Sequence, residues 1–97
     1  MAEAVNQWFC YMIRCNGGSL YVGMTQDVVK RVKRHNDGAG AEFTSRHRPV
    51  ELVWSEICCD SDAARQREKE IKGWSRERKE ALIAGALQIA AKSDASR

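Results

Sequence analysis

The sequence Asn-Gly-Gly at residues 16–18, set between two short apolar runs, constrains the fold more than any other feature of the chain. Asn-Gly in this setting is the strongest short-range signal for a β-hairpin, because a tight hairpin turn needs residues that accept positive φ angles. We therefore expect strands over residues 8–14 and 19–24. Tyr11 and Tyr21 then lie on opposite strands at about the same level, as cross-strand neighbours. Two adjacent phenols are either core packing or the floor of a site.

A chain of 97 residues has room for one hydrophobic core, and its composition of 43% hydrophobic and 30% charged residues is typical of a soluble globular domain. We divide it into a flexible leader over residues 1–7, a folded domain over 8–84 and a mobile C-terminal tail over 85–97. Its apolar runs are too short for a membrane-spanning helix, so no membrane partner is expected. An acid, Glu3, stands where a signal peptide carries basic residues, which predicts a cytoplasmic protein.

The cysteines predict reduced thiols rather than a metal centre. They lack the paired C-x-x-C spacing of zinc sites, so no zinc is expected. Cys10 and Cys58 are expected to pack in or beside strands, as free thiols of cytoplasmic proteins do.

Helix signals follow the hairpin. Thr25 is expected to cap a helix over residues 26–36, whose apolar stripe is formed by Val28, Val29 and Val32. Asp-Gly after residue 36 predicts the end of this helix, because glycine accepts the left-handed conformation that often follows one.

A long loop over residues 37–49 is expected next, then a third strand over 50–57 and helices over 63–72 and 76–84. A connection of that length in a small domain is often functional. From residue 30 to residue 48 the chain carries six Lys or Arg and two His against two acids. A basic stretch of this kind indicates either a polyanion partner or a solvated surface.

Glu68 is the main anomaly of the pattern. In the helix over 63–72 it shares a face with Ala64 and Ile71, which is the face expected to pack on the sheet. A buried carboxylate is costly unless it is paired with a base or binds a metal ion. Glu68 is therefore either the partner of Arg31 or another base, or a metal ligand.

Arg31 and His35 lie one helical turn apart, on a flank of the valine stripe. A guanidinium presents a planar fork that matches a phosphate, whereas the alternative for Arg31 is an ion pair with Glu68 or Asp27. His35 either orients a water or a phosphate near neutral pH, or is a hydrogen-bonded core residue. Together with the two phenols and the carboxylate, these groups have the chemistry that phosphodiester hydrolysis needs.

This set of residues resembles the GIY-YIG endonuclease superfamily, and within it the small stand-alone bacterial proteins of the YhbQ type. The resemblance covers residues 8–83. It is carried by Tyr11-Met12-Ile13, by Leu20-Tyr21-Val22-Gly23, by Arg31 with His35 and Asn36, and by Glu68 in the run Glu68-Lys69-Glu70-Ile71-Lys72-Gly73-Trp74. One departure is that Cys10-Tyr11-Met12-Ile13 stands where the family has Gly-Ile-Tyr.

The resemblance implies a single domain of the α+β class, with a central three-stranded antiparallel sheet flanked by helices. It also implies a DNA endonuclease with one Mg²⁺ or Mn²⁺ ion held by Glu68, acting in DNA repair or recombination. The implied catalytic residues are Tyr11, Tyr21, Arg31, His35 and Glu68. Arg31 would lie on the scissile phosphate and His35 would support the phosphate or nucleophile side. One of the two tyrosines, with Tyr21 slightly favoured over Tyr11, would act as the general base or relay a proton to it. The implied substrate-binding residues are Gly23, Thr44 and Arg46.

Two other functions remain open from the sequence. The same basic face fits a non-catalytic nucleic-acid-binding module, and the domain could be a subunit that needs a protein partner to act. A carboxylate such as Glu68 on the phosphate side would repel DNA unless a cation lay between them, which favours the nuclease. Nothing in the chain reads as a sequence-recognition element, so we expect weak sequence preference and a substrate selected by its structure, such as branched, nicked or single-stranded DNA.

Overall fold

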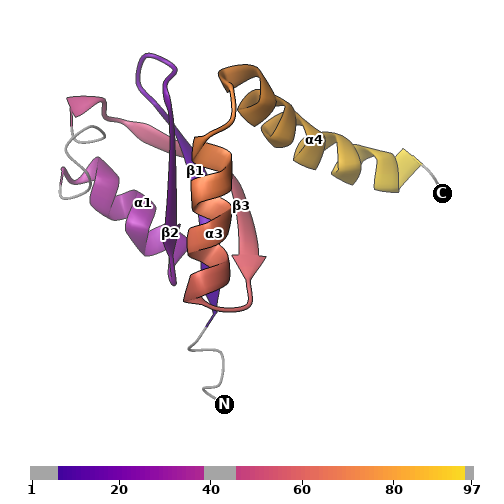
Figure 1. Ribbon diagram of the computed structural model, residues 1–97. Coiled ribbons are helices and arrows are strands. Elements are labelled where there is room, and N and C mark those ends of the chain that lie inside the picture. The colour runs from indigo at the N-terminus through magenta and orange to yellow at the C-terminus, as the bar shows by residue number, and fades with distance from the viewer. Residues whose placement is uncertain (1–6, 39–45, 96–97) are drawn as a thin grey trace.

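The structure is a computed structural model in which residues 7–38 and 46–95 are described, with side chains described up to residue 85. A three-stranded antiparallel sheet with strand order β2-β1-β3 lies between helices on its two faces, as Figure 1 shows. This confirms the expected α+β fold. The elements are β1 (Trp8–Cys15), β2 (Leu20–Thr25), α1 (Val28–Asn36), β3 (Val50–Cys58), α3 (Ser61–Lys72) and α4 (Arg76–Ala95).

The β1–β2 hairpin has a different register from the expected one. Its turn is centred on Gly17, which has a φ of +100°, and not on the preceding asparagine. Tyr11 therefore lies opposite Gly23, and Tyr21 lies opposite Ile13. The expectation that the two tyrosines face each other directly is wrong. The Tyr11–Gly23 and Ile13–Tyr21 pairs are two positions apart in the ladder, with Met12–Val22 between them. The two tyrosines project from the same face of the sheet, because paired residues share a face and alternate residues of a strand return to it.

Helix α1 begins later than expected, and of its expected apolar stripe Val28 and Val32 are partly buried whereas Val29 is not. Asp27 caps the helix by accepting a hydrogen bond from the backbone N–H of Lys30 at 3.0 Å. Thr25, the expected cap, is the last residue of β2, and its hydroxyl accepts from the N–H of Asp27. Val29 is 80% exposed, so the expected valine stripe is wrong at this position. His35 instead is the buried residue of the helix, at 2% exposure.

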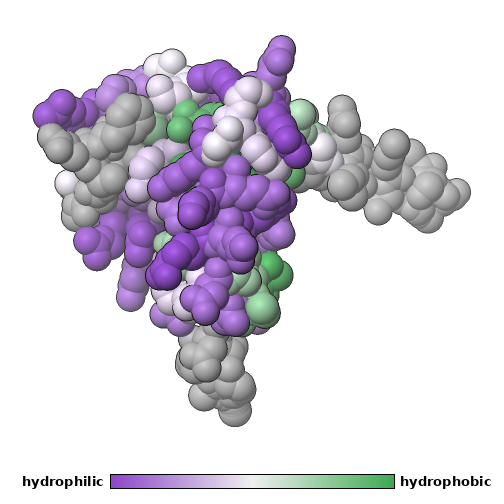
Figure 2. Space-filling model, in the orientation of Figure 1, coloured by the Kyte–Doolittle hydropathy of each residue, from purple (hydrophilic) through white to green (hydrophobic). Residues whose placement is uncertain are grey.

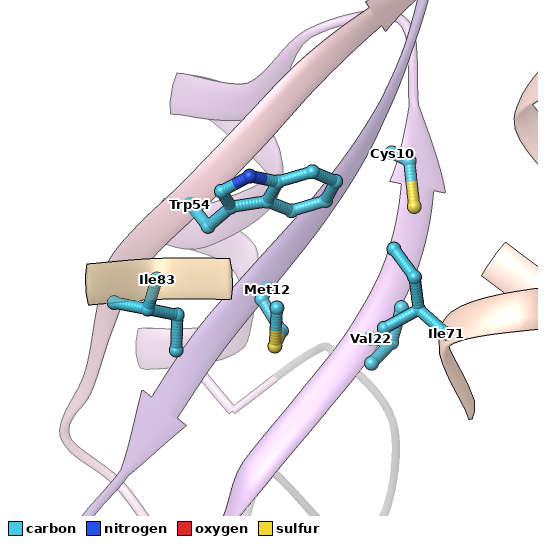
Figure 3. Close-up of a cluster of buried hydrophobic side chains, with 6 residues drawn as sticks. All are labelled: Cys10, Met12, Val22, Trp54, Ile71 and Ile83. Atoms are coloured by element: carbon cyan, nitrogen blue, oxygen red, sulfur yellow. The ribbon is translucent and has the colours of Figure 1, made fainter. Parts of the chain in front are cut away.

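Two cores lie on the two faces of β1, because alternate residues of a strand point to opposite faces. On the α3 side an apolar cluster packs together, and Figure 3 shows its six members: Cys10, Met12, Val22, Trp54, Ile71 and Ile83. On the α1 side the cluster contains a phenol, and its buried members are Tyr11, Ile13, Cys15 and Val50. Cys10 and Cys58 are free thiols in β1 and β3, as expected.

The helices α3 and α4 differ from expectation in their bounds. Asp60 caps α3, so this helix begins two residues before the expected start. The helix α4 continues to Ala95, through most of the segment that we assigned to a tail, and whether that segment is mobile stays a prediction. None of the helices in the described part of the chain is both long and apolar enough to cross a membrane.

Candidate active site

A tyrosine–histidine pair is buried between β1 and α1. The Tyr11 hydroxyl lies 3.0 Å from Nε2 of His35, and both side chains are fully enclosed. Burial raises the pKa of Tyr11 to about 12, although the nearby Arg31 guanidinium acts in the opposite direction. Burial also lowers the pKa of His35, and the charges of Arg31 and Arg34 lower it further. At neutral pH the pair therefore consists of a protonated phenol and a neutral imidazole.

Gly23 makes room for this phenol. A Cβ atom at position 23 would lie 2.6 Å from the Tyr11 hydroxyl oxygen and 2.7 Å from its Cζ atom. Real Cβ atoms do not approach other atoms so closely. The glycine of the Tyr-Val-Gly motif is thus needed for the packing of the Tyr11 ring across β2. This is a structural reason for Gly23 that we did not expect from the sequence.

Tyr21 lies beside the same histidine but is partly exposed. Its ring centroid is 5.4 Å from that of His35, in an edge-on arrangement with an interplanar angle of 66°. His35 therefore contacts both tyrosines, with a hydrogen bond to Tyr11 and a ring contact to Tyr21. Of the two phenols, only that of Tyr21 is partly open to solvent, because Tyr11 is 1% exposed.

Arg31 is partly buried and has no acidic partner within residues 7–38 and 46–95. Its Nη1 donates to the backbone carbonyl of Met24 at 3.5 Å, and its guanidinium is close enough to Tyr11 to oppose the rise in that residue's pKa. The alternative reading, an ion pair with Glu68 or Asp27, is wrong. Glu68 pairs with Lys72 instead, and Asp27 caps α1.

Glu68 occupies the inner face of α3, as its spacing predicts. Ala64 and Ile71 on that face are fully buried, and the Glu68 side chain is 19% exposed. Its carboxylate lies 2.9 Å from Nζ of Lys72. This hydrogen bond is the main reason why the pKa of Lys72 is raised. Lys72 was not among the expected site residues, although a Glu followed by a Lys four residues later is a recognisable helical ion pair.

The candidate site lies astride the edge strand β2. The tyrosines, Arg31 and His35 belong to the α1 side of the sheet, whereas Glu68 and Lys72 belong to α3 on the other side, as Figure 1 shows for the two helices. The two groups are nevertheless within electrostatic reach. The charge of Glu68 contributes to the raised pKa of Tyr11, and a charge on Tyr21 contributes to that of Lys72.

Two expected substrate-binding residues are not placed in this site. Thr44 lies outside the described residues. Arg46 is exposed and directly precedes a segment that is tied to the hairpin turn, where the N–H of Asn16 donates to the carbonyl of His47 at 2.8 Å.

A hard divalent cation could bind at Glu68 only with help from other ligands. In the described part of the chain there is no group of three or more His, Cys, Asp or Glu side chains that would form a complete metal site. Mg²⁺ is commonly held by one or two carboxylates, with waters and substrate phosphates completing its shell. The partly exposed carboxylate of Glu68 fits that mode of binding, provided that Lys72 releases it.

Comparisons with known proteins identify the family of the chain. The family model for the GIY-YIG catalytic domain matches residues 7–81. The chain therefore belongs to the GIY-YIG family, a family of nuclease domains, and within it to the UPF0213 branch. This confirms the resemblance drawn from the hairpin, Arg31 and Glu68.

The relatives come from several bacteria. A UPF0213 protein of Staphylococcus epidermidis is 44% identical over 79 residues, which cover 81% of this chain and 96% of that protein. A UPF0213 protein of Vibrio cholerae is 42% identical over 90 residues, which cover 92% of this chain and 89% of that protein. The solution NMR structure of a UPF0213 protein from Bacillus halodurans matches with a TM-score of 0.53 and 36% identity, covering 80% of this chain and 83% of that one. These names assign no reaction to the relatives.

Proposed function

We propose that the chain is a metal-dependent DNA endonuclease that hydrolyses phosphodiester bonds at the β2 edge. The observation that carries this proposal is the set of groups that surround the Arg31 guanidinium. Among the described residues this partly buried guanidinium has no carboxylate partner, and it lies beside the Tyr11 phenol at the edge of a sheet that has an acid on its other side. Arginine in such surroundings is suited to a phosphate, which offers the planar, charged contact that the protein itself does not supply.

In this proposal Arg31 binds the scissile phosphate and stabilises the negative charge that grows on its oxygens as water attacks. A new bond forms between the water oxygen and phosphorus, and the bond from phosphorus to the departing sugar oxygen breaks. The attacking water must lose a proton. The Tyr21 hydroxyl is proposed to accept this proton while it gives up its own proton to solvent, and the departing sugar oxygen takes a proton from solvent. Tyr21 is chosen because it is the one of the pair that solvent can reach.

Tyr11 and His35 act in support of this step. With a pKa of about 12, the buried Tyr11 keeps its proton at neutral pH, and its hydroxyl fixes the imidazole of His35 at 3.0 Å. His35 in turn lies against the edge of the Tyr21 ring and orients it. The neutral imidazole leaves Arg31 as the cation that meets the phosphate on this side of the sheet.

Glu68 would hold one Mg²⁺ or Mn²⁺ ion, and such an ion supplies charge neutralisation on the phosphoryl oxygens or the leaving group. The protein's part is to provide a carboxylate on the far side of β2 from Arg31. Lys72 keeps this carboxylate paired, and so stabilised, when no cation is bound.

We further propose a substrate that is selected by its structure, such as branched, nicked or single-stranded DNA, with weak sequence preference and a role in DNA repair or recombination. The described residues offer cations and phenols for phosphates rather than a helix shaped to read base edges. Gly23, Thr44 and Arg46 are proposed to help place the DNA backbone. For Gly23, the packing of Tyr11 is an additional role.

The test is a cleavage assay on plasmid, single-stranded and branched DNA with Mg²⁺, Mn²⁺ or EDTA. Glu68→Ala is compared with Glu70→Ala, a matched acid of the same helix whose carboxylate pairs with Arg67 at 3.0 Å. Wild type and Glu70→Ala are expected to cut at least one substrate with a divalent cation and none with EDTA, whereas Glu68→Ala is expected to be inactive. Titration calorimetry measures the affinity for Mn²⁺ in the absence of DNA. This affinity should be weaker in Glu68→Ala than in wild type and should be unchanged in Glu70→Ala.

One result would overturn this function, and a second would overturn the assignment of Glu68 as the metal ligand. If wild type binds DNA but cuts no substrate with either metal ion, the domain is a binding module. If Glu68→Ala retains full metal-dependent cleavage, the ion is held elsewhere.

A further inference from the structure

A hollow of about 310 Å³ opens beside the candidate site, where the start of β2 meets the start of α4. Among the described residues it is lined by Ser19, Leu20, Arg76 and Lys79, and we call it the hairpin pocket. Figure 1 shows that the β1–β2 turn and the beginning of α4 lie at the same end of the molecule. Arg76 holds them together, because its Nη2 donates to the carbonyl of Gly18 at 2.6 Å.

The charges around the hairpin pocket are not balanced. Glu80 is the carboxylate at its rim, and Arg14 binds it through two hydrogen bonds of 2.8 and 3.0 Å. Arg76 shares the same carboxylate at 3.1 Å. Lys79 makes no ion pair within the part of the chain that the structure describes and is only partly exposed. The two charged residues that line the pocket are thus both cations, Arg76 and Lys79, and only Arg76 is paired with Glu80.

The lining also has the hydrogen-bonding groups that a phosphate needs. Arginine and lysine donate only, and the hydroxyl of Ser19 can donate as well. Leu20 forms an apolar wall suited to the sugar or base attached to a phosphate. Figure 2 shows hydrophilic side chains gathered over α3 and the start of α4, so this cationic hollow is continuous with a polar surface.

The hairpin pocket lies directly along the edge strand from the candidate site. Ser19 is two residues from Tyr21, a separation of about 6.6 Å along an extended strand. This is close to the rise of about two nucleotides, since one DNA strand carries a charge per ~3.4 Å. Lys72 is the last residue of α3, four residues before Arg76 at the start of α4.

We propose that the hairpin pocket is a phosphate subsite that binds the substrate strand one or two nucleotides from the scissile phosphate. The inference rests on the proposed nuclease function and extends it. With Arg31 on the scissile phosphate, the hairpin pocket would hold a second phosphate of the same strand toward the start of β2. Lys79 supplies a charge that has no acidic partner among the described residues, while Arg76 is held in place by Glu80 and the turn.

The experiment measures binding without catalysis. Fluorescence anisotropy with a labelled single-stranded oligonucleotide in EDTA gives the Kd at several salt concentrations, for wild type, Lys79→Glu and Lys79→Ala. The control is Lys33→Glu, which makes the same charge change at an exposed position of α1 that pairs with Asp37. We expect Lys79→Glu to weaken binding about tenfold and to lower the salt slope by about one, Lys79→Ala to act in the same direction, and Lys33→Glu to do much less.

A single methylphosphonate, which removes one phosphate charge, locates the contact along the strand. Moved along the oligonucleotide, it should weaken wild-type binding most at one position near the cleavage site, and Lys79→Ala should lose that sensitivity. If Lys79→Glu binds like Lys33→Glu while wild type still cuts DNA, the subsite is wrong and the nuclease function stands. If wild type neither binds nor cuts DNA, both proposals fail.

Discussion

Arg31 and Arg67 are both partly buried arginines, one on each side of the sheet, and their surroundings are opposite. Arg67 on α3 pairs with Glu56 at 3.1 Å and with Glu70 at 3.0 Å, and its guanidinium lies over the rings of Trp54 and Trp74. Arg31 on α1 has a backbone carbonyl and a phenol as neighbours and no carboxylate in the described part of the chain. Arg67 is thus neutralised by two acids, whereas Arg31 has no acid beside it among the described residues.

The two cores also differ in whether they contain polar groups. The α3 side of β1 is an apolar cluster around Met12 and Trp54, which stabilises the fold through burial alone. The α1 side instead buries the Tyr11–His35 pair, whose polar atoms need each other because neither is open to water. Chemistry is therefore expected on the α1 side and stability on the α3 side, and Glu68 is the one acid that brings the α3 side into the site.

Substitution of the two arginines tests this comparison with the largest expected effect. Arg31→Ala should lower single-turnover cleavage by about 10²- to 10³-fold, because a charge contact to the transition state is lost. Its melting temperature should hardly change. Arg67→Ala should leave the cleavage rate near that of wild type and should lower stability by about 1 kcal/mol, through lost ion pairs and ring contacts. Equal losses of cleavage in Arg31→Ala and Arg67→Ala would contradict the assignment of Arg31 to catalysis and of Arg67 to packing.

The two tyrosines sharpen the comparison within the α1 side. Tyr21→Phe should lower cleavage by about 10²-fold, as expected for loss of a proton-transfer group, with little change in stability. Tyr11→Phe removes the hydrogen bond between the Tyr11 hydroxyl and Nε2 of the buried His35, so it should lower stability by about 1–3 kcal/mol. Cleavage rates and thermal melts of both variants check this. A larger rate loss in Tyr11→Phe than in Tyr21→Phe would assign the proton transfer to the buried phenol.

Gly23→Ala probes how tightly the α1 side is packed. The added Cβ would fall 2.6 Å from the Tyr11 hydroxyl, and the enclosed ring has little room to move. We expect a loss of about 1–3 kcal/mol, as for other overpacked cores, together with reduced cleavage. Gly85→Ala, where a Cβ meets nothing within 4 Å, is the matched control and should not destabilise the protein. A neutral effect of Gly23→Ala in urea unfolding would contradict the packing of Tyr11 across β2.

The smallest expected effect is on the pH dependence of stability. The pKa of His35 is lowered from 6.5 in the folded state by burial and by Arg31 and Arg34, while the rings of Tyr11 and Tyr21 lie beside it. As pH falls below 6.5 the unfolded chain takes up a proton and the folded chain does not, so stability is full above pH 6.5 and declines below it. Thermal melts from pH 7.5 to 5 should show this decline, and His35→Gln should reduce it. An unchanged slope in His35→Gln would place the effect on other groups.

Much of this arrangement could be predicted from the sequence. The Asn-Gly-Gly turn predicts the hairpin, and the spacing of Ala64, Glu68 and Ile71 predicts that an acid lies on the inner face of α3. These features depend on local periodicity and turn chemistry, which a single sequence carries. The fold and the family followed from them.

Three features of the site could not be read locally. The register that sets Tyr11 over Gly23 depends on which glycine centres the turn, and the sequence offers both. The burial of His35 depends on how α1 is rotated on the sheet, and Val29 has the stronger apolar character yet is exposed. The sequence allows either Arg31 or Lys72 as the partner of Glu68. Lys72 is the partner because it lies on the same helix as Glu68, whereas α1 with Arg31 lies on the opposite face of the sheet.

The central claim is that the two sides of β2 form one site, and a double-mutant cycle on single-turnover cleavage with Mg²⁺ tests it most directly. Arg31→Ala, Glu68→Ala and the double variant are compared with wild type on one DNA substrate. Residues that act together in one catalytic unit have strongly non-additive effects. The account predicts that the double variant is no slower than the slower single variant. Losses that multiply independently, or a Glu68→Ala rate equal to that of wild type, would contradict it.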